Sequence, residues 1–245
     1  MARIGTFMSW GCAVIAGALT LFAVLPMPTA GAAPNAATLY QEAMATTKAW
    51  RVHYVSTSNV AQVPFFESGN AGPASGTQTI VVGQGATLDR ALLIVIGDLT
   101  YVKGNTRAME DLTGLSPAEA ATAMDHWVLF SSNNPTFSQV VVGVRSYDVA
   151  DEIALQGPLT LGPSRELHGY RVDALRGTQK LQGAQKMTAV LYVRASGRHD
   201  LVEEDTVDTQ GKVNGAEHIV FSKWGESVKP RAPQASITLG TVNET

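Results

Sequence analysis

Short β-strand patterns separated by turn residues follow one another from residue 165 onward. Of all features of the sequence, they restrict the possible folds most strongly. Four segments alternate apolar and polar residues, and turn signals divide them. Strand patterns that follow one another at such short intervals pair as antiparallel neighbours. The segments are 165–175, 186–197, 198–208 and 216–227. An antiparallel sheet is therefore the predicted centre of the fold.

Helical patterns alternate with strand patterns in the rest of the chain. Residues 35–50 form a predicted helix with Asn35 as its cap, and residues 114–127 begin a second helix at Ser116 and Pro117. Residues 51–105 are predicted strands, and residues 134–157 are predicted to form one or two helices. The order helix, strands, helices, strands predicts an α+β fold whose helices cover one face of an antiparallel sheet.

Side-chain alternation assigns faces to three of the predicted strands. Tyr170, Val172 and Ala174 form the predicted inner set of residues 168–175. Ala189, Leu191 and Val193 share one face of their segment and form its predicted inner set. The segment "ALLIVIG", residues 91–97, is apolar on both faces. This pattern predicts a central strand that is covered on both sides.

The N-terminal segment has the features of a secretory signal peptide. Arg3 is followed by residues 4–28, which carry no charge, and Ala30-Gly31-Ala32 fits a small-residue cleavage site. Cleavage after Ala32 would leave residues 33–245 as a single domain, secreted or periplasmic and associated with the cell envelope. The alternative is an uncleaved membrane anchor, because a bilayer span needs about 20 apolar residues and the run reaches that length.

Cys12 is the only cysteine of the 245 residues. In a bacterial lipoprotein the acylated cysteine follows the apolar core of the signal, whereas here the core follows Cys12, and Ser9 replaces the expected leucine. We therefore expect no acylation at Cys12. After cleavage at Ala32 the domain has no cysteine, which removes disulfides, thiolate catalysis and cysteine metal sites.

The charge balance argues against two classes of partner. The chain has 18 Lys and Arg against 21 Asp and Glu, and no run of five or more basic residues occurs. Nucleic-acid binding requires concentrated positive charge, as does electrostatic attachment to anionic lipid. Neither function is expected of this chain.

Motifs for catalysis are absent from the sequence. It contains no G-x-S-x-G, no H-E-x-x-H, no phosphate-binding loop and no G-x-G-x-x-G. The acidic segment 198–208 offers one alternative, a metal-assisted hydrolase built on His199, Asp205 and His218. A solvated hairpin with opposite charges facing across its strands explains the same residues. The prediction is a non-enzyme with no catalytic residues, no metal and no cofactor.

Several segments together resemble actinobacterial envelope lipoproteins of the LppX/LprG group, which are distant relatives of the lipoprotein carrier LolA. "YVKGN", "DLTGLSPAEAA" and "HWVLF" are similar to the middle of these proteins, and "LYVRASGRHDLVEED" with "IVFSKWGESVKPRAP" is similar to their closing strands. The similarity covers roughly residues 36–235. The missing acylation motif is where this chain departs from the group.

The resemblance implies a strongly curved antiparallel sheet, an unclosed half-barrel, with helices packed on its concave face. It also implies that an apolar cavity between them holds the acyl chains of a lipid or glycolipid carried between cell-envelope membranes. An envelope protein-interaction module is a further alternative. The candidate ligand-binding residues are the apolar positions of the central strands and the middle helix: Ile80, Val82, Ile94, Ile96, Phe137, Val140, Val141, Leu191 and Val193.

Overall fold

The computed structural model describes residues 35–60, 63–134, 143–180, 186–208, 217–227 and 229–239. The compact unit begins at Asn35 and continues to the C-terminus. Its helices and a short 3-10 turn are α1 (Ala36–Ala49), η1 (Gly85–Thr87), α2 (Thr106–Thr113), α3 (Pro117–Ala123) and α5 (Ser146–Glu152). The predicted helices at the N-terminus and after Ser116 are confirmed, whereas α2 was not predicted. None of the described helices is long and apolar enough to cross a membrane.

Local sequence explains where these helices begin. Asn35 caps α1 by accepting a hydrogen bond from the Thr38 backbone nitrogen. Asn105 caps α2 in the same way through the Ala108 nitrogen. A full capping box, Ser116 with Glu119, opens α3. Within the predicted helical stretch 134–157, α5 ends at Glu152, and the last residues already belong to a strand.

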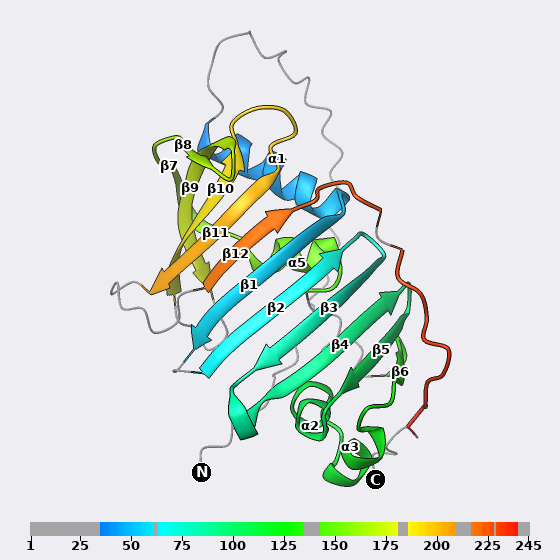
Figure 1. Cartoon of the computed structure of the whole chain (residues 1–245). Coiled ribbons are helices and arrows are strands. Elements are labelled where there is room, and N and C mark those ends of the chain that lie inside the picture. Colours follow the sequence, from blue (N-terminus) through cyan, green and yellow to red (C-terminus); the bar gives the residue numbers. More distant parts are fainter. Residues whose placement is uncertain are drawn as a thin grey trace, which may run out of the picture. The chain divides into compact units, whose positions relative to one another are not determined.

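Twelve antiparallel strands form one sheet that does not close (Figure 1). Their order is β6-β5-β4-β3-β2-β1-β12-β11-β10-β9-β7, and β8 pairs with β9 outside this path. The predicted α+β fold with an unclosed antiparallel sheet is confirmed. The strands are β1 (Val52–Val60), β2 (Val63–Ala71), β3 (Ser75–Val82), β4 (Asp89–Ile96), β5 (Leu99–Gly104), β6 (Val128–Ser131), β7 (Gln156–Leu161), β8 (Arg165–Leu167), β9 (Tyr170–Lys180), β10 (Lys186–Arg194), β11 (Leu201–Asp208) and β12 (Glu217–Ser222).

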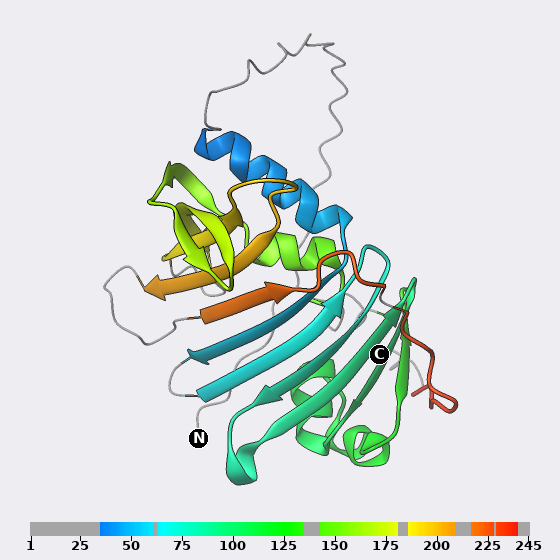
Figure 2. The same ribbon diagram turned by 45° about the horizontal axis from the view of Figure 1, so that its top comes forward.

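The described helices cover one face of this sheet, here called the inner face (Figure 2). They divide between its two ends. Helices α1 and α5 pack with inner residues of β1 and β9–β12, whereas α2 and α3 pack with inner residues of β4–β6. Two separate hydrophobic clusters result, which we call the α1/α5 core and the α2/α3 core. The prediction that Ala189, Leu191 and Val193 face inward is confirmed, because all three are fully buried in the α1/α5 core. The same prediction for Tyr170, Val172 and Ala174 is wrong, because Val172 and Ala174 pack with Tyr192 and Val202 on the opposite, outer face.

Strand β4 corrects one expectation. Ala91, Leu93 and Val95 are buried on the inner face. The side chains between them point outward, and Leu92 is 40% exposed. The strand is central, as predicted, but only its inner face is covered, because the described helices all pack on that side. An apolar run on both faces is therefore not sufficient evidence for two covering layers.

Candidate functional site

The inner face is half covered at one end of the central strands, whereas Glu67 and Gln78 further along these strands are buried. Ile80, at this end, also packs against the edge of the α2/α3 core. Three apolar residues lie on this face of β2 and β3: Phe65, Ile80 and Val82. Phe65 pairs with Val82, and Ile80 pairs with Glu67, whose side chain is buried on the inner face. All three are half-buried, whereas inner residues at both ends of the sheet are fully buried. We call this apolar strip, Phe65, Ile80 and Val82, the central trough. Within the described part of the inner face, it is where the packing departs from that of an ordinary core.

A buried polar group lies next to the central trough. The Tyr54 hydroxyl is 2.6 Å from Oε1 of Glu67 and 2.8 Å from the Gly143 carbonyl oxygen. The Gln78 side-chain nitrogen donates to both Tyr54 and Glu67, at 2.9 and 2.6 Å. These residues come from β1, β2, β3 and the segment before α5. They therefore tie the centre of the sheet to the chain that leads into the helix.

Glycine creates the space for this polar group. The ring of Tyr54 lies so close over Gly69 that a β-carbon on residue 69 would be 2.5 Å from Cε1 of the ring. Gly76 admits the Val144 carbonyl oxygen in the same way, since a β-carbon on residue 76 would collide with that oxygen. Gly143 has a positive φ of 76°, which glycine adopts without strain. The sequence thus permits a side chain and a backbone segment to approach the sheet closely.

We expect Gly69→Ala to displace the Tyr54 ring and to lower the free energy of unfolding by roughly 1–3 kcal/mol, the usual cost of overpacking. Urea unfolding of the purified protein measures this. Ser68→Ala is the matched control on the same strand, because its side chain faces the opposite side of the sheet. Equal stability of the two variants would show that the ring does not need the space over Gly69.

The hydrogen bonds indicate a proton on Glu67. Tyr54 has one hydroxyl hydrogen, and both the Gly143 carbonyl and a Glu67 carboxylate would require it. A protonated Glu67 removes this conflict. Burial raises the pKa of Glu67 to about 7, against the opposing effect of the hydrogen bonds from Tyr54 and Gln78. Near neutral pH this carboxyl is therefore poised between its neutral and charged forms.

Three further carboxyl groups belong to the same region. Glu204 and Glu217 lie on the inner face of β11 and β12, and Glu152 ends α5. Burial is the first cause that raises the pKa of each of them. Neighbouring carboxylates add to the rise in pKa for Glu152 and Glu204. Among the described residues, the ion pairs of the protein involve none of these three groups and not Glu67.

Glu204 is the most extreme of these groups. Its side chain is fully buried, and neither carboxylate oxygen has a partner at hydrogen-bond geometry among the described residues. The nearby Gln179 amide nitrogen donates to the Glu152 backbone carbonyl, and its interaction with Glu204 lowers the pKa of that carboxyl against the larger effect of burial. A buried carboxyl without a partner costs stability. Strict alternation would place Glu204 and Val202 on one face, whereas the structure places them on opposite faces.

A register shift between β10 and β11 explains why Glu204 and Val202 lie on opposite faces. The pairing of β10 with β11 slips between Tyr192 and Val193, so that Val193 faces Leu201 and Tyr192 faces Glu203. Val202 and Glu203 then both lie on the outer face, where Val202 packs with Tyr192. Glu204 consequently turns inward beside Leu191. A β-bulge reassigns every later side chain of a strand, and single-sequence alternation does not detect it.

The predicted ligand-binding residues separate into four groups. Ile80 and Val82 belong to the central trough. Leu191 and Val193 are fully buried inside the α1/α5 core. Ile94 and Ile96 lie on the outer face of β4, so they cannot share one inner cavity with the others. Phe137, Val140 and Val141 lie outside the described residues.

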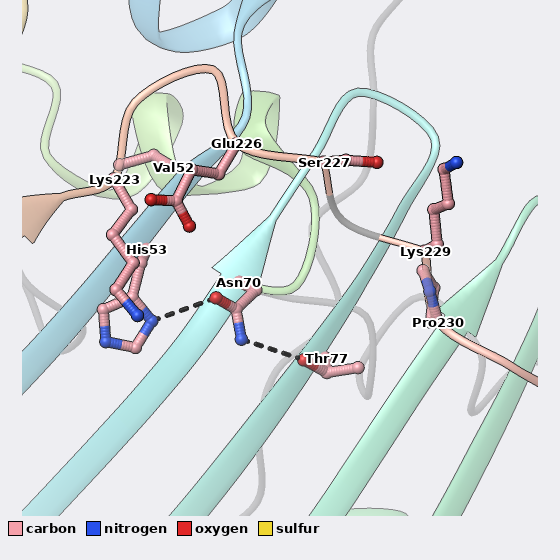
Figure 3. Close-up of a pocket in the computed structure, with 9 residues that line it drawn as sticks. All are labelled: Val52, His53, Asn70, Thr77, Lys223, Glu226, Ser227, Lys229 and Pro230. Atoms are coloured by element: carbon pink, nitrogen blue, oxygen red, sulfur yellow. Dashed lines mark hydrogen bonds between the residues drawn. The ribbon is translucent and has the colours of Figure 1, made fainter.

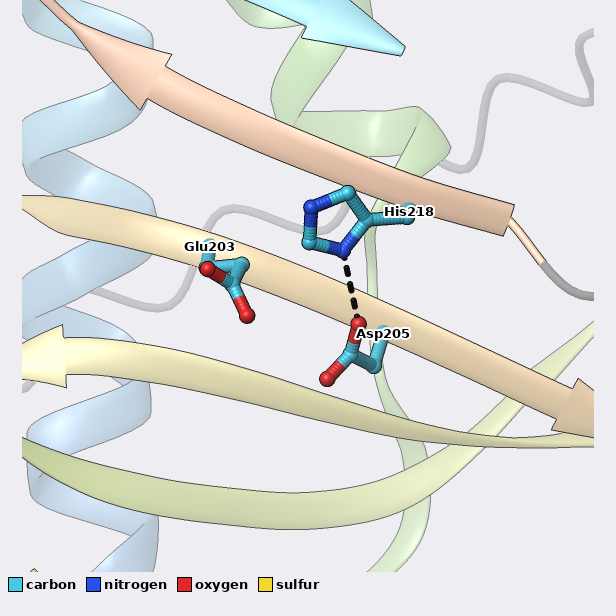
Figure 4. A group of neighbouring side chains, drawn as sticks. All are labelled: Glu203, Asp205 and His218. Atoms are coloured by element: carbon cyan, nitrogen blue, oxygen red, sulfur yellow. Dashed lines mark hydrogen bonds and ion pairs between the residues drawn. The ribbon is translucent and has the colours of Figure 1, made fainter. Parts of the chain in front are cut away.

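The metal-site alternative is corrected by the position of His199. Its Nδ1 is 3.0 Å from the Arg194 carbonyl oxygen, and its Nε2 is 3.4 Å from Glu42 of α1. The group that does form is Glu203, Asp205 and His218 on the outer face (Figure 4). Asp205 faces His218 across β11 and β12, with 2.8 Å between Oδ1 and Nδ1.

Arg165 and His168 already contact the acidic residues of this outer group. Arg165 lies 3.6 Å from Glu203 and 4.0 Å from Asp205, and its guanidinium stacks on Tyr192. His168 Nε2 is 2.9 Å from the second oxygen of Glu203. The arrangement is the cross-strand charge pairing expected of a solvated hairpin.

A polar pocket of about 270 Å³ opens on the outer face (Figure 3). Asn70 connects three of the lining residues by hydrogen bonds. Its Oδ1 is 3.0 Å from His53 Nδ1, and its Nδ2 donates to Thr77 Oγ1 at 3.4 Å. The other lining residues are Val52, Lys223, Glu226, Ser227, Lys229 and Pro230. Its charged and polar lining is unsuited to an acyl chain.

No family model matches the sequence, and no curated protein matches it. The structure nevertheless aligns with LprF from Mycobacterium bovis at a TM-score of 0.51 and 16% sequence identity, over 81% of this chain and 96% of LprF. The chain has the fold of LprF. The resemblance stated from the sequence is thus confirmed at the level of the fold. Mycobacterium tuberculosis lipoprotein LppX aligns at a TM-score of 0.46 and 17% identity, over 79% of this chain and 97% of LppX.

Proposed function

We propose that this protein is a non-enzymatic carrier that binds the acyl chains of a lipid or glycolipid of the cell envelope. The observation that carries the proposal is the central trough, an apolar strip on the inner face that remains half covered at one end of the central strands. The fold shared with LprF supports the same assignment, because the sequence resembles the envelope lipoproteins of the LppX/LprG group.

Acyl-chain binding needs apolar surface rather than reactive groups. Each buried CH₂ contributes about 0.8 kcal/mol, so a sixteen-carbon chain offers on the order of 10 kcal/mol before the costs of association. Phe65, Ile80 and Val82 supply such a surface along two adjacent strands. The proposed binding residues are therefore these three, together with the predicted Phe137, Val140 and Val141. Leu191 and Val193 support the fold as core residues.

Ile80 and Ile94 form a matched pair for the test. They lie on adjacent strands and are both half-buried, but they face opposite sides of the sheet. We expect Ile80→Asp to weaken the binding of a neutral fluorescent acyl probe at least about tenfold, which corresponds to roughly 1.4 kcal/mol. Ile94→Asp should leave the affinity unchanged.

Thermal unfolding followed by circular dichroism establishes that both variants fold, and Val82→Thr is a milder second variant of the trough. If the two aspartate variants lose affinity equally, the probe does not bind on the inner face. If the unchanged protein binds no acyl probe, the carrier proposal is wrong.

A further inference from the structure

The inner face next to the central trough has an excess of negative groups. Glu67, Glu152, Glu204 and Glu217 come from three neighbouring strands and one helix, and they act electrostatically on one another. The described ion pairs elsewhere in the protein join carboxylates to Arg, Lys or His, but none of them reaches this set. Glu67 contacts Tyr54 and Gln78, and Glu217 Oε1 accepts a hydrogen bond from Ser56 Oγ at 2.7 Å. These partners are neutral, so no described positive side chain balances the four carboxyls beside the apolar trough.

Glu204 shows that this arrangement is not a set of solvated surface acids. It is fully buried, and no described residue lies at hydrogen-bond geometry to either carboxylate oxygen. The charges of Glu217 and Glu152 raise the pKa of Glu204, and Glu204 and Glu217 lie on the inner face of the adjacent strands β11 and β12. Glu217 and Glu152 retain accessible surface, whereas Glu204 does not. The accessible pair can contact a ligand, and Glu204 adds negative potential behind it.

The spacing of the group favours an organic cation over a metal ion. Among the described residues, the acidic and histidine side chains close enough to share one ion are Glu203, Asp205 and His218, which lie on the outer face. The inner carboxyls are too dispersed to meet at one ion. An ammonium group on a flexible chain can instead contact one or two carboxylates while its chain lies along apolar side chains.

We propose that the inner face binds a cationic amphiphile, with its hydrocarbon chain in the central trough and its ammonium group against Glu217 and Glu152. This inference rests on the proposed acyl-chain function and adds the charge of the ligand's head group. Without such a ligand a proton must neutralise the buried carboxyls. The ammonium group would replace that proton with a charge-assisted hydrogen bond in a low-dielectric site. An anionic head group would meet repulsion in the same place.

The test compares three chains of equal length at about pH 8: hexadecylamine, hexadecan-1-ol and hexadecanoic acid. Each one competes with a neutral fluorescent acyl probe for the full chain. We expect hexadecylamine to bind at least about tenfold more tightly than the alcohol, and the acid to bind least tightly. Glu217→Gln should bring the amine within about threefold of the alcohol, and Glu152→Gln should act in the same direction.

Asp205→Asn is the matched control. It removes an equal charge from β11, one residue from Glu204 but on the outer face, and should leave the preference for the amine unchanged. Equal affinity for amine and alcohol would overturn the cation inference and leave the acyl-chain proposal intact. A preference that survives both glutamine variants would overturn the assignment of the site. Failure of all three chains to displace the probe would overturn both proposals.

Discussion

The protein is expected to lose stability as the pH rises from about 4.5 to about 8, and Glu67→Gln should remove much of this loss. Glu67 has a pKa of about 7 in the folded protein, against an ordinary value of 4.5. A raised carboxyl pKa means that the folded state holds the proton more tightly than the unfolded state. Its stabilising contribution is therefore complete below about pH 4.5 and is lost as the pH rises through about 7.

The expected size is roughly 3 kcal/mol for Glu67 alone, because each unit of pKa difference corresponds to about 1.4 kcal/mol. Tyr54 and Gln78 face Glu67 through hydrogen bonds and oppose the rise in pKa, whereas Glu217 adds to it. The Glu152, Glu204 and Glu217 carboxyls also have raised pKa values, so they give the same sign of pH dependence.

Urea unfolding at several pH values measures this directly. Glu67→Gln keeps an acceptor oxygen for Tyr54 or Gln78 and has no charge to lose, so its stability should vary much less with pH. Glu166→Gln, an exposed position on β8, is the control and should follow the unchanged protein. A Glu67→Gln protein with an unaltered pH profile would contradict the buried, proton-holding state of Glu67.

Replacement of Glu204 by methionine is expected to stabilise the protein by roughly 1–3 kcal/mol, the penalty of an unsatisfied buried polar group. Methionine is unbranched and close to glutamate in shape, and Leu191 and Ile219 lie beside the position on neighbouring strands. A stabilising change at a buried position is unusual, because most substitutions destabilise. It would indicate that Glu204 is retained at a cost to stability, as is common for groups that serve binding.

The adjacent residue gives the opposite expectation and so serves as the control. Glu203 is nearly as buried as Glu204, but it pairs with His168 and Arg165 on the outer face. Glu203→Met removes these contacts and should destabilise by roughly 0.5–1.5 kcal/mol. Denaturant midpoints of the two variants should therefore shift in opposite directions. A loss of stability in Glu204→Met would show that its carboxyl is satisfied in the folded protein.

The contrast between Glu203 and Glu204 also explains what sequence can predict for this fold. Alternation correctly placed Ala189, Leu191 and Val193 on the inner face, because β10 is regular there. One register shift between β10 and β11 then places Val202 on the outer face with Glu203, and Glu204 on the inner face. Local periodicity contains no information about where a partner strand slips.

The position of the candidate site is likewise determined by contacts between residues far apart in the sequence. The resemblance to envelope lipoproteins predicted an inner-face site, and Ile80 and Val82 are placed there. It could not separate Ile80 from Ile94, since both are apolar strand residues and only the position of the helices distinguishes the two faces. The Tyr54, Glu67 and Gln78 group escaped detection because its members are far apart in the sequence and meet only through strand register.

Native mass spectrometry of the full chain, purified from a bacterial host without detergent, is the decisive test of acyl-chain binding on the inner face. We predict one co-purified acyl-chain ligand per protein, retained in Ile94→Asp and lost in Ile80→Asp. Extraction into organic solvent would then identify the lipid and the charge of its head group. A protein that carries no ligand, or an Ile80→Asp variant that retains it fully, would contradict binding at the central trough.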